Sequence, residues 1–435
     1  MPNEEETSDK NYGPRDSGND LRGFDEPEER PARADLKLIV ILKDKIRGHV
    51  NQSRGVAAWL VKRTGAQMAE IEIPELKRIA CLKTRRAAAA LLSGDKKNAR
   101  EWLAVSGGDV TARTLAQLLL ECGIREGDAT SLMLLSAGSM PAFYNIALGA
   151  VWRCMCTTIM TPSVIGTDMF DFAIVPDHDY PDESPNILPT VGAPNLIVRE
   201  ELGPPGEALL KEFPPRYERR WGLLIGGDDK NYRLSASWMH KQLGKVFREA
   251  EKDGVDLYIS TSRRTSPEAE NALRRMVSSC GNVRFFLAAS ADPFNAVPGI
   301  LGACDEMFVT DDSVNMVSET VTAGHRVILL KTERAGMFKK RLQLATAMMV
   351  ESGLLPKKAL WGAPRFDRTY QSFRNMGLLT DFVDWIYERR HDNIFPVSAE
   401  DDADWNREGF NEARRAADWI LSNLPGIIHP EEQSL

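Results

Sequence analysis

Hydroxyl, carboxylate and amide side chains concentrate between residues 310 and 319, directly after the apolar run 307–309. A buried strand, a short polar turn and a helix that opens at Ser313 would point the free N–H groups of Ser313, Val314 and Asn315 at one position in space. The positive end of the helix dipole would lie at the same position. The pattern therefore predicts an anion site, and a phosphate group is the anion that suits it best.

Glu319 extends this prediction from a phosphate to a nucleotide. It lies six residues after Ser313, so it falls on the first turns of the predicted helix. A carboxylate there could accept hydrogen bonds from ribose hydroxyl groups. An alternative interpretation needs no ligand: Ser313 is then only the N-cap of the helix, and Glu319 faces solvent.

Glycine and polar residues also follow other predicted strands, where ligands bind in open α/β sheets. Gly48, His49 and Asn51 come after the strand predicted at 36–42. Gly48 permits a close backbone approach, and His49 would project from the edge of the sheet. Asp179 follows a later strand of the same half. An imidazole or a positioned carboxylate can remove a proton from a hydroxyl group, so His49 and Asp179 are candidate general bases, with His49 preferred.

Two strand ends in the second half carry groups suited to an anion. Gly226 and Gly227 follow one of these strands, and Arg263 and Arg264 follow the next. Glycines allow an anion to approach backbone N–H groups, and a guanidinium group can hold it with two parallel hydrogen bonds. Because the helix terminus and the arginines supply the positive field, no metal is expected. We expect these groups to line a cleft between two domains.

The spacing of apolar residues predicts two successive series of strands and helices, which is typical of parallel sheets. The first series has strands at 36–42, 71–73, 131–136, 157–161 and 171–175, with helices at 52–64 and 141–152. The second series has strands at 221–225, 256–260, 283–287, 307–309 and 327–330, with helices at 235–252 and 267–279. A proline-rich stretch, 182–215, separates them. The predicted fold class is therefore α/β with two Rossmann-like domains.

These patterns divide the chain of 435 residues into five parts. Residues 1–34 form an acidic tail with too few apolar groups to order itself. The first Rossmann-like domain occupies 35–200, a linker 201–218 and the second domain 219–377. Residues 378–435 carry aromatic side chains at near-helical spacing, and we expect them to pack as helices on the first domain.

Composition places the chain among ordinary globular proteins, with 43% hydrophobic and 27% charged residues and a net charge of −7. No apolar run approaches the roughly 18 residues of a membrane span. The N-terminus has neither a basic segment nor an apolar one, so no secretory signal is predicted and a cytoplasmic location is expected. The six cysteines are too scattered for a disulfide framework, and buried thiols are expected.

Residues 77–100 contain eight basic side chains and one acidic side chain, on a stretch whose composition favours helix. Such a surface could contact anionic lipid, which would make the protein peripheral at a membrane. A solvated helix face is the simpler interpretation. No nucleic-acid partner is expected.

Five motifs resemble, in order, those of the mitochondrial-fission "elongated mitochondria" family. They occupy residues 47–55, 176–179, 186–193, 261–265 and 312–319. The resemblance covers about residues 36–335 and is specific in the combination of motifs. More distantly, the layout is similar to GT-B glycosyltransferases, whose peptidoglycan-synthesising members also carry a Gly-His-Val loop and a late Ser…Glu element.

The resemblance implies two facing Rossmann-like domains with a nucleotide-sugar cleft between them, as in the GT-B fold. A nucleotide diphosphate sugar, with UDP as the candidate nucleotide, would bind the second domain as substrate, and no cofactor is implied. Its ribose would lie on Glu319, and its diphosphate on the N–H groups near Ser313 and Gly226 and on Arg263. The sugar would pass to an unidentified acceptor on the first domain.

Two other functions remain open. One is a nucleotide-sugar 2-epimerase on the same fold, which needs two acid/base groups beside one carbon atom. The other is a non-catalytic recruitment protein at a membrane. The family resemblance also has departures, because Asp177 and Asn315 replace residue types that are common in the family at those positions. Fold alone does not separate these functions.

Overall fold

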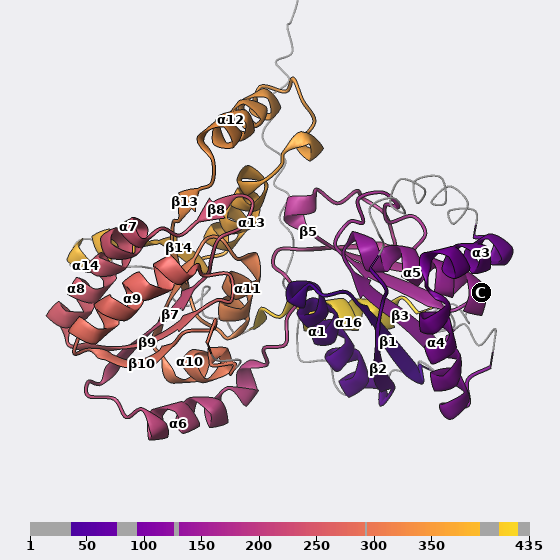
Figure 1. The fold of residues 1–435 in the computed structure, drawn as a ribbon, viewed down its shortest axis with the longest axis horizontal. Coiled ribbons are helices and arrows are strands. Elements are labelled where there is room, and N and C mark those ends of the chain that lie inside the picture. Colours follow the sequence, from indigo (N-terminus) through magenta and orange to yellow (C-terminus); the bar gives the residue numbers. More distant parts are fainter. Residues whose placement is uncertain (1–35, 76–93, 126–129, 292–293, 392–408, 425–435) are drawn as a thin grey trace, which may run out of the picture.

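The structure is a computed structural model that describes residues 36–75, 94–125, 130–291, 294–391 and 409–424. Two lobes lie side by side, each built around a parallel sheet of six strands (Figure 1). The colours of Figure 1 show that the first half of the chain forms one lobe and most of the second half forms the other. This confirms the expected α/β class with two Rossmann-like domains.

In the first domain the strand order is β2-β1-β3-β4-β5-β6, and every neighbouring pair is parallel. Its strands are β1 (Leu38–Lys43), β2 (Gln67–Glu72), β3 (Leu132–Ala137), β4 (Met155–Ile159), β5 (Phe172–Pro176) and β6 (Ile187–Thr190). Its helices are α1 (Arg47–Thr64), α3 (Lys96–Ser106), α4 (Asp109–Glu121) and α5 (Ser139–Trp152).

The β1 strand is apolar from Leu38 to Leu42 because helices cover both faces of this sheet. Leu38, Val40 and Leu42 contribute to the core beneath α3, α4 and α5. Ile39 and Ile41 point to the other face, into a core shared with α1 and with α16 (Glu412–Ser422). Successive side chains of a strand alternate between faces, so a strand buried on both sides has no polar positions.

In the second domain the strand order is β10-β9-β7-β11-β12-β14, again parallel between neighbours. Its strands are β7 (Arg219–Ile225), β9 (Val255–Thr261), β10 (Val283–Leu287), β11 (Glu306–Thr310), β12 (Val327–Leu330) and β14 (Leu379–Asp381). Its helices are α6 (Gly203–Glu212), α7 (Ala236–Trp238), α8 (Gly244–Asp253), α9 (Pro267–Ser279), α10 (Val297–Ala303), α11 (Val314–Thr322), α12 (Met337–Glu351), α13 (Ala363–Asn375) and α14 (Phe382–His391).

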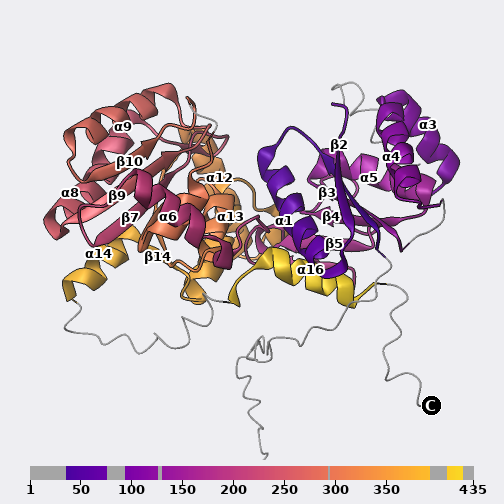
Figure 2. The same ribbon diagram turned by 90° about the horizontal axis from the view of Figure 1, so that it is seen from below.

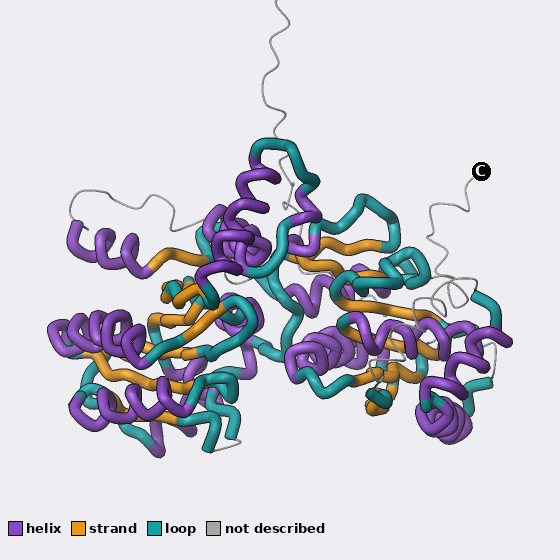
Figure 3. Tube along the Cα trace, turned by 45° about the horizontal axis from the view of Figure 1, so that its top comes forward, coloured by secondary structure: helices purple, strands orange, loops and turns teal. Residues whose placement is uncertain are grey.

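Short elements complete this domain. The helix predicted at 235–252 is broken into α7, a π-helical turn at Met239–Leu243 and α8. A two-stranded antiparallel sheet joins β8 (Tyr232–Arg233) to β13 (Glu333–Arg334). In Figure 3 helix α12 projects from the top of the molecule, away from the two main sheets.

The C-terminal part of the chain departs from its predicted course. Residues 378–435 were expected to return together to the first domain, but β14 is the edge strand of the second sheet and α14 packs into the second core through Phe382 and Trp385. Among the described residues, the segment that returns is α16, which lies along α1 (Figure 2). Its apolar face, with Ala413, Ala417 and Ile420, closes the first core.

The expected linker 201–218 also contains structure, because α6 packs against α10 of the second domain. The predicted tail 1–34 lies outside the described residues, as does most of the basic segment 77–100. The described end of that segment forms the start of α3, which is capped by Asp95. In the described part of the chain, no helix is both long and apolar enough to cross a bilayer.

Each sheet has one place where the order of strands reverses direction. After β1 the chain adds β2 on one side and β3 on the other, and after β7 it adds β9 on one side and later β11 on the other. Ligands of open α/β sheets bind outside the carboxyl ends of the strands at such a point. The topology therefore predicts ligand sites at the loops after β1, β3, β7 and β11.

Candidate functional site

His49 lies in the first turn of α1, directly after β1, and its ring is held from two sides. Its Nδ1 atom lies 2.8 Å from Oδ2 of Asp44. A carboxylate accepts, so Nδ1 carries a proton, and in the neutral ring the lone pair is then on Nε2. Gly138, after β3, packs against the ring so closely that a Cβ atom there would lie 2.5 Å from Cε1 of His49. Asp44 and Gly138 thus fix the tautomer and the position of the ring.

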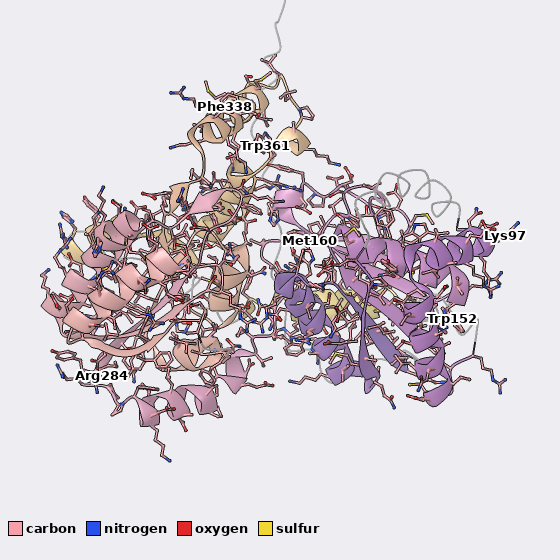
Figure 4. All side chains as sticks on the ribbon, in the orientation of Figure 1. Lys97, Trp152, Met160, Arg284, Phe338 and Trp361 are labelled. Atoms are coloured by element: carbon pink, nitrogen blue, oxygen red, sulfur yellow. The ribbon has the colours of Figure 1, made fainter. Side chains whose placement is uncertain are left out.

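The imidazole borders a cavity of about 500 Å³ at the carboxyl end of the first sheet. The walls come from the loops after β3, β4 and β5 and from the start of α13 in the second domain. Hydroxyl and charged groups line it, among them Ser139, Thr161, Ser163, Lys358 and Arg365. Met160, another lining residue, is labelled in Figure 4 on the side of the first lobe that faces the second. The cavity therefore offers hydrogen-bonding groups to a polar ligand that could reach His49.

Asp179, the other predicted base, borders the same cavity, but its carboxylate is already engaged. Oδ1 accepts a hydrogen bond of 2.6 Å from Nη2 of Arg365, and Oδ2 accepts one of 3.0 Å from the N–H of Thr161. Its side chain is 9% exposed. Because Arg365 belongs to α13, this ion pair joins the two domains. A carboxylate held in this way is better suited to bracing the cavity than to taking up a proton.

His178, next to Asp179, is buried and also joins the loop after β5 to α13. Its Nδ1 atom lies 3.0 Å from Oγ1 of Thr369, and its ring meets that of Phe366 edge to face. Burial lowers the pKa of His178 to about 4, so the ring is neutral at physiological pH. This environment is that of a scaffold residue, which holds the loop after β5 in place.

The predicted anion site at the start of α11 has the expected backbone. Ser313 is the N-cap, in extended conformation, and its Oγ atom accepts a hydrogen bond from the N–H of Met316. The N–H groups of Val314 and Asn315 have no acceptor among the described residues. Two donors and the positive end of the helix dipole are therefore available to an anion at this position.

The Gly226-Gly227 turn after β7 lies beside this helix, but its amides are not free. The N–H of Gly226 donates to Oγ1 of Thr310, and that of Gly227 donates to Oδ2 of Asp312. The expectation that these amides bind a diphosphate therefore does not fit the geometry. Both glycines are required for another reason, because a Cβ atom at either would collide with Asp312 or with the backbone of Arg264.

Arg264 and Arg263 have different environments. Arg264 donates to Oδ2 of Asp312 at 2.8 Å, with the Asp312 side chain fully buried, so it holds the β9 loop against the start of α11. Arg263 is exposed and has no partner within the described parts of the chain. Of this pair, Arg263 is the guanidinium group that remains available to a ligand.

Glu319 lies two turns into α11, half-buried, and no described residue donates a hydrogen bond to its carboxyl group. Burial raises its pKa from the ordinary 4.5 to about 7. Asn51, on α1, is also half-buried and forms no side-chain hydrogen bond within the described residues. A half-buried carboxyl group without a partner is a candidate acceptor for ligand hydroxyl groups.

Helix α11 forms the seam between the domains. Asn315 Oδ1 accepts a hydrogen bond of 3.1 Å from Nε2 of Gln52, and a Cβ atom on Gly48 would lie 2.6 Å from Nδ2 of Asn315. Further along, the N–H of Ala193 donates to Ser318. The first turn of α1, which carries His49, thus lies directly against the first turn of α11.

The structure brings the predicted residues together in two groups that meet at this seam. His49 and Asp179 border the cavity, whereas Ser313, Val314, Asn315 and Glu319 lie on α11 and do not line it. Sequence reasoning missed Asp44, Gly138 and Arg365. Asp44 could have been found as an acidic residue at a strand end, five positions before His49, but Arg365 reaches the cavity from a helix with no local signal.

No group of three or more side chains suited to metal binding occurs in the parts of the chain that are described. Asp311 and Asp312 are buried and hydrogen-bonded to Thr332 and to Thr310 and Arg264, respectively. Burial raises the pKa of Asp311 to about 6. These two carboxylates therefore organise the loop after β11.

Residues 47–424 match the model of the family described as mitochondrial fission ELM1. No curated protein matches the chain significantly. The family match starts at the first turn of α1 and ends just after α16, so it leaves out β1 and covers the rest of both domains.

Solved structures with a similar arrangement have very different sequences. A UDP-GlcNAc 2-epimerase from Neisseria meningitidis bound to UDP-GlcNAc is 10% identical, with a TM-score of 0.43 over 89% of this chain and 99% of that one. The glycosyltransferase of kitacinnamycin is 13% identical, with a TM-score of 0.44 over 90% and 100%. A UDP-glucosyltransferase from Polygonum tinctorium is 10% identical, with a TM-score of 0.41 over 90% and 99%. Likeness at this level carries no inference about the reaction.

Proposed function

The chain belongs to the mitochondrial fission ELM1 family, and from that premise and the geometry of the seam we propose that it is a glycosyltransferase using a nucleotide diphosphate sugar. One observation carries the proposal: the first turn of α1, with His49, lies against the first turn of α11, with its two free N–H groups. A proton acceptor and an anion site on opposing domains are what transfer from an activated sugar requires.

In this mechanism the donor lies on the second domain. The N–H groups of Val314 and Asn315 and the guanidinium group of Arg263 hold the diphosphate, and Glu319 accepts hydrogen bonds from the ribose. These groups supply positive charge where the leaving diphosphate gains negative charge. The donor needs no metal ion for this step.

The acceptor hydroxyl group lies in the cavity beside His49. Nε2 of His49 takes the hydroxyl proton, the acceptor oxygen forms a bond to C1 of the sugar, and the bond from C1 to the diphosphate oxygen breaks. The electron pair of that bond leaves with the diphosphate. Asp44, through its hydrogen bond to Nδ1, stabilises the imidazolium that forms.

Binding is tested by thermal-shift screening of the full chain against UDP, GDP, ADP, CDP and dTDP sugars, because a ligand selective for the folded state raises the melting temperature. We expect one nucleotide class to raise it and the Arg263→Ala variant to lose most of that shift. A flat response to all of them would contradict the proposal and favour the recruitment function.

Catalysis is tested on the nucleotide class that binds, by measuring release of the nucleotide diphosphate. His49→Gln is expected to retain the thermal shift and to lose about 10²–10⁴-fold in rate, the usual contribution of a general base. Asp44→Asn is expected to lose less. If both variants bind and turn over like the parent, His49 is not the base.

A further inference from the structure

Helix α12 has its polar side turned inward and its apolar side turned outward. Gln343 is 4% exposed and donates to Oδ1 of Asn231, and Thr346 accepts a hydrogen bond from the indole of Trp361. Lys339 donates to the backbone oxygen of Lys230. A helix that packs on a protein normally does the reverse, with its apolar stripe against the core.

The outward stripe follows helical spacing. Phe338, Leu342 and Met349 are 81%, 49% and 43% exposed, and they are separated by four and then seven residues. Positions at such separations lie on one face of a helix. Leu344, Met348 and Leu354 enlarge the exposed apolar surface on this helix and on the turn that follows it. Figure 4 labels Phe338 at the upper end of the molecule, on the projecting helix.

Basic side chains surround this stripe. Residues 337–360 contain five lysines and arginines against one acidic residue, Glu351, hence a net charge of +4 in a chain whose total is −7. Lys340, Arg341 and Lys357 are exposed, whereas Lys358, at the edge of the cavity, forms an ion pair with Asp182. An apolar stripe flanked by lysine and arginine is the composition of a helix that lies in the surface of an anionic bilayer.

We propose that α12 and the turn after it dock the protein on an anionic lipid bilayer, with the stripe of Phe338, Leu342 and Met349 in the headgroup region. The helix has 15 residues, fewer than the roughly 20 needed to span a bilayer, so it lies in the plane of the surface. This surface, at residues 337–360, involves other residues than the basic segment 77–100 considered above.

Charge and shape favour a lipid bilayer on this surface over a second copy of the chain or another protein. Two copies meeting through the same surface would bring two positively charged surfaces together, which opposes association. The apolar groups lie on a helix that projects from the molecule (Figure 3). A fluid bilayer needs no complementary shape, whereas a protein partner does.

The test is co-sedimentation of the full chain with vesicles of phosphatidylcholine alone or mixed with phosphatidylglycerol. The protein is expected to bind the mixed vesicles, more weakly as salt rises, and to remain in solution with phosphatidylcholine. Lys340→Glu with Arg341→Glu is expected to lower binding more than about tenfold, since each basic residue near the surface contributes appreciably. Phe338→Ser with Leu342→Ser is expected to lower it similarly.

Matched controls change equivalent residues elsewhere. Lys245→Glu with Arg248→Glu reverses two exposed basic residues on α8, and Leu120→Ser removes an exposed leucine from α4. Both are expected to bind vesicles like the parent, and unchanged melting temperatures show that each variant folds.

Three results would overturn the proposal. The parent chain fails to bind mixed vesicles; or the α12 variants bind as the parent does while reversal of Lys83, Arg85 and Arg86 abolishes binding; or sedimentation velocity shows a dimer that the α12 variants dissociate. The last result would instead assign the stripe to a second copy of the chain.

Discussion

Gly48 of the first domain and Asn315 of the second are in such close contact that a Cβ atom on Gly48 would lie 2.6 Å from Nδ2 of Asn315. The absence of a side chain at Gly48 lets α1 and α11 meet at their first turns. His49 follows Gly48 directly, so the contact sets the distance between the candidate base and the anion site.

Gly48→Ala is expected to weaken nucleotide binding. The amide of Asn315 must turn away from the new methyl group and lose its hydrogen bond to Gln52, which moves the start of α11. We expect a loss of about 1 kcal/mol in binding free energy, measured by calorimetry. Gly244→Ala is the control, since a Cβ atom there meets only the end of Arg248 at 3.5 Å and alanine favours helix. Equal affinities for both variants and the parent would show that the seam does not position the nucleotide.

Val314→Pro tests the backbone donor itself. Proline lacks the N–H group but is well accepted at the first position of a helix, and Ser313 already has the extended conformation that must precede it. The chain uses the same Ser-Pro start in α9, at Ser266 and Pro267. We expect nucleotide affinity to fall roughly tenfold, the value of one hydrogen bond to a charged group.

Val314→Ala is the matched variant, because it shortens the side chain and keeps the N–H group. It is expected to bind the nucleotide like the parent. If the proline and alanine variants bind equally well, the N–H group of Val314 does not contact the diphosphate.

Gly138→Ala is expected to impair catalysis through His49. The residue has φ of +83°, and a Cβ atom would collide with the imidazole ring. Gly65→Ala is the control, because Gly65 has φ of +74° with nothing within 4 Å of the added atom. Both variants suffer backbone strain, about 1–2 kcal/mol at Gly65 in the left-handed region and more at Gly138, whose ψ of 174° is almost exclusive to glycine. A fall in turnover in Gly138→Ala alone would show the ring collision, whereas equal turnover in the two would contradict it.

Asp179→Asn tests whether Asp179 holds the cavity wall in place or acts as the general base. If Asp179 braces the cavity, the variant loses the ion pair with Arg365 and about 1–3 kcal/mol of unfolding free energy, while turnover at saturating substrate stays within a few-fold of the parent. Denaturant unfolding and steady-state kinetics measure the two effects. If the variant is as stable as the parent but its turnover falls a thousandfold, Asp179 is the general base.

The raised pKa of Glu319 predicts that nucleotide affinity depends on pH. The ionised carboxylate accepts ribose hydroxyl groups at both oxygens, so affinity should increase as pH rises through about 7. Glu319→Gln should bind more weakly and lose this dependence. Titrations of both proteins between pH 6 and 8 measure it. If the affinity of the parent protein does not change over that pH range, Glu319 does not bind the ribose.

The free protein gives an independent check on the same group. Because burial raises the folded pKa of Glu319 from 4.5 to about 7, the unfolded state releases its proton first as pH rises. The unfolding free energy of the parent should therefore fall between these pH values relative to Glu319→Gln. We expect a relative change of about 1 kcal/mol, since solvent still reaches the carboxyl group.

The amino-acid sequence determined the α/β class and the strands of both sheets except β6 and β14. The runs 38–42 of β1 and 221–225 of β7 contain no charged or other strongly polar residue, which is typical of strands covered on both faces, and both runs are buried in the fold. It also determined the capped start of α11, because a serine before a helix and the helix's unpaired N–H groups are local features.

Only the tertiary structure decided which of these groups remain available to a ligand. The glycines after β7 looked like anion donors, yet Thr310 and Asp312 take their N–H groups, and Arg365 reaches Asp179 from 186 residues away. The tertiary structure also decided that β14 and α14 belong to the second domain, whereas α16 packs on the first. The physical reason is that a hydrogen-bond partner or a packing surface is set by which elements meet in space, and the spacing of residues along the chain does not record it.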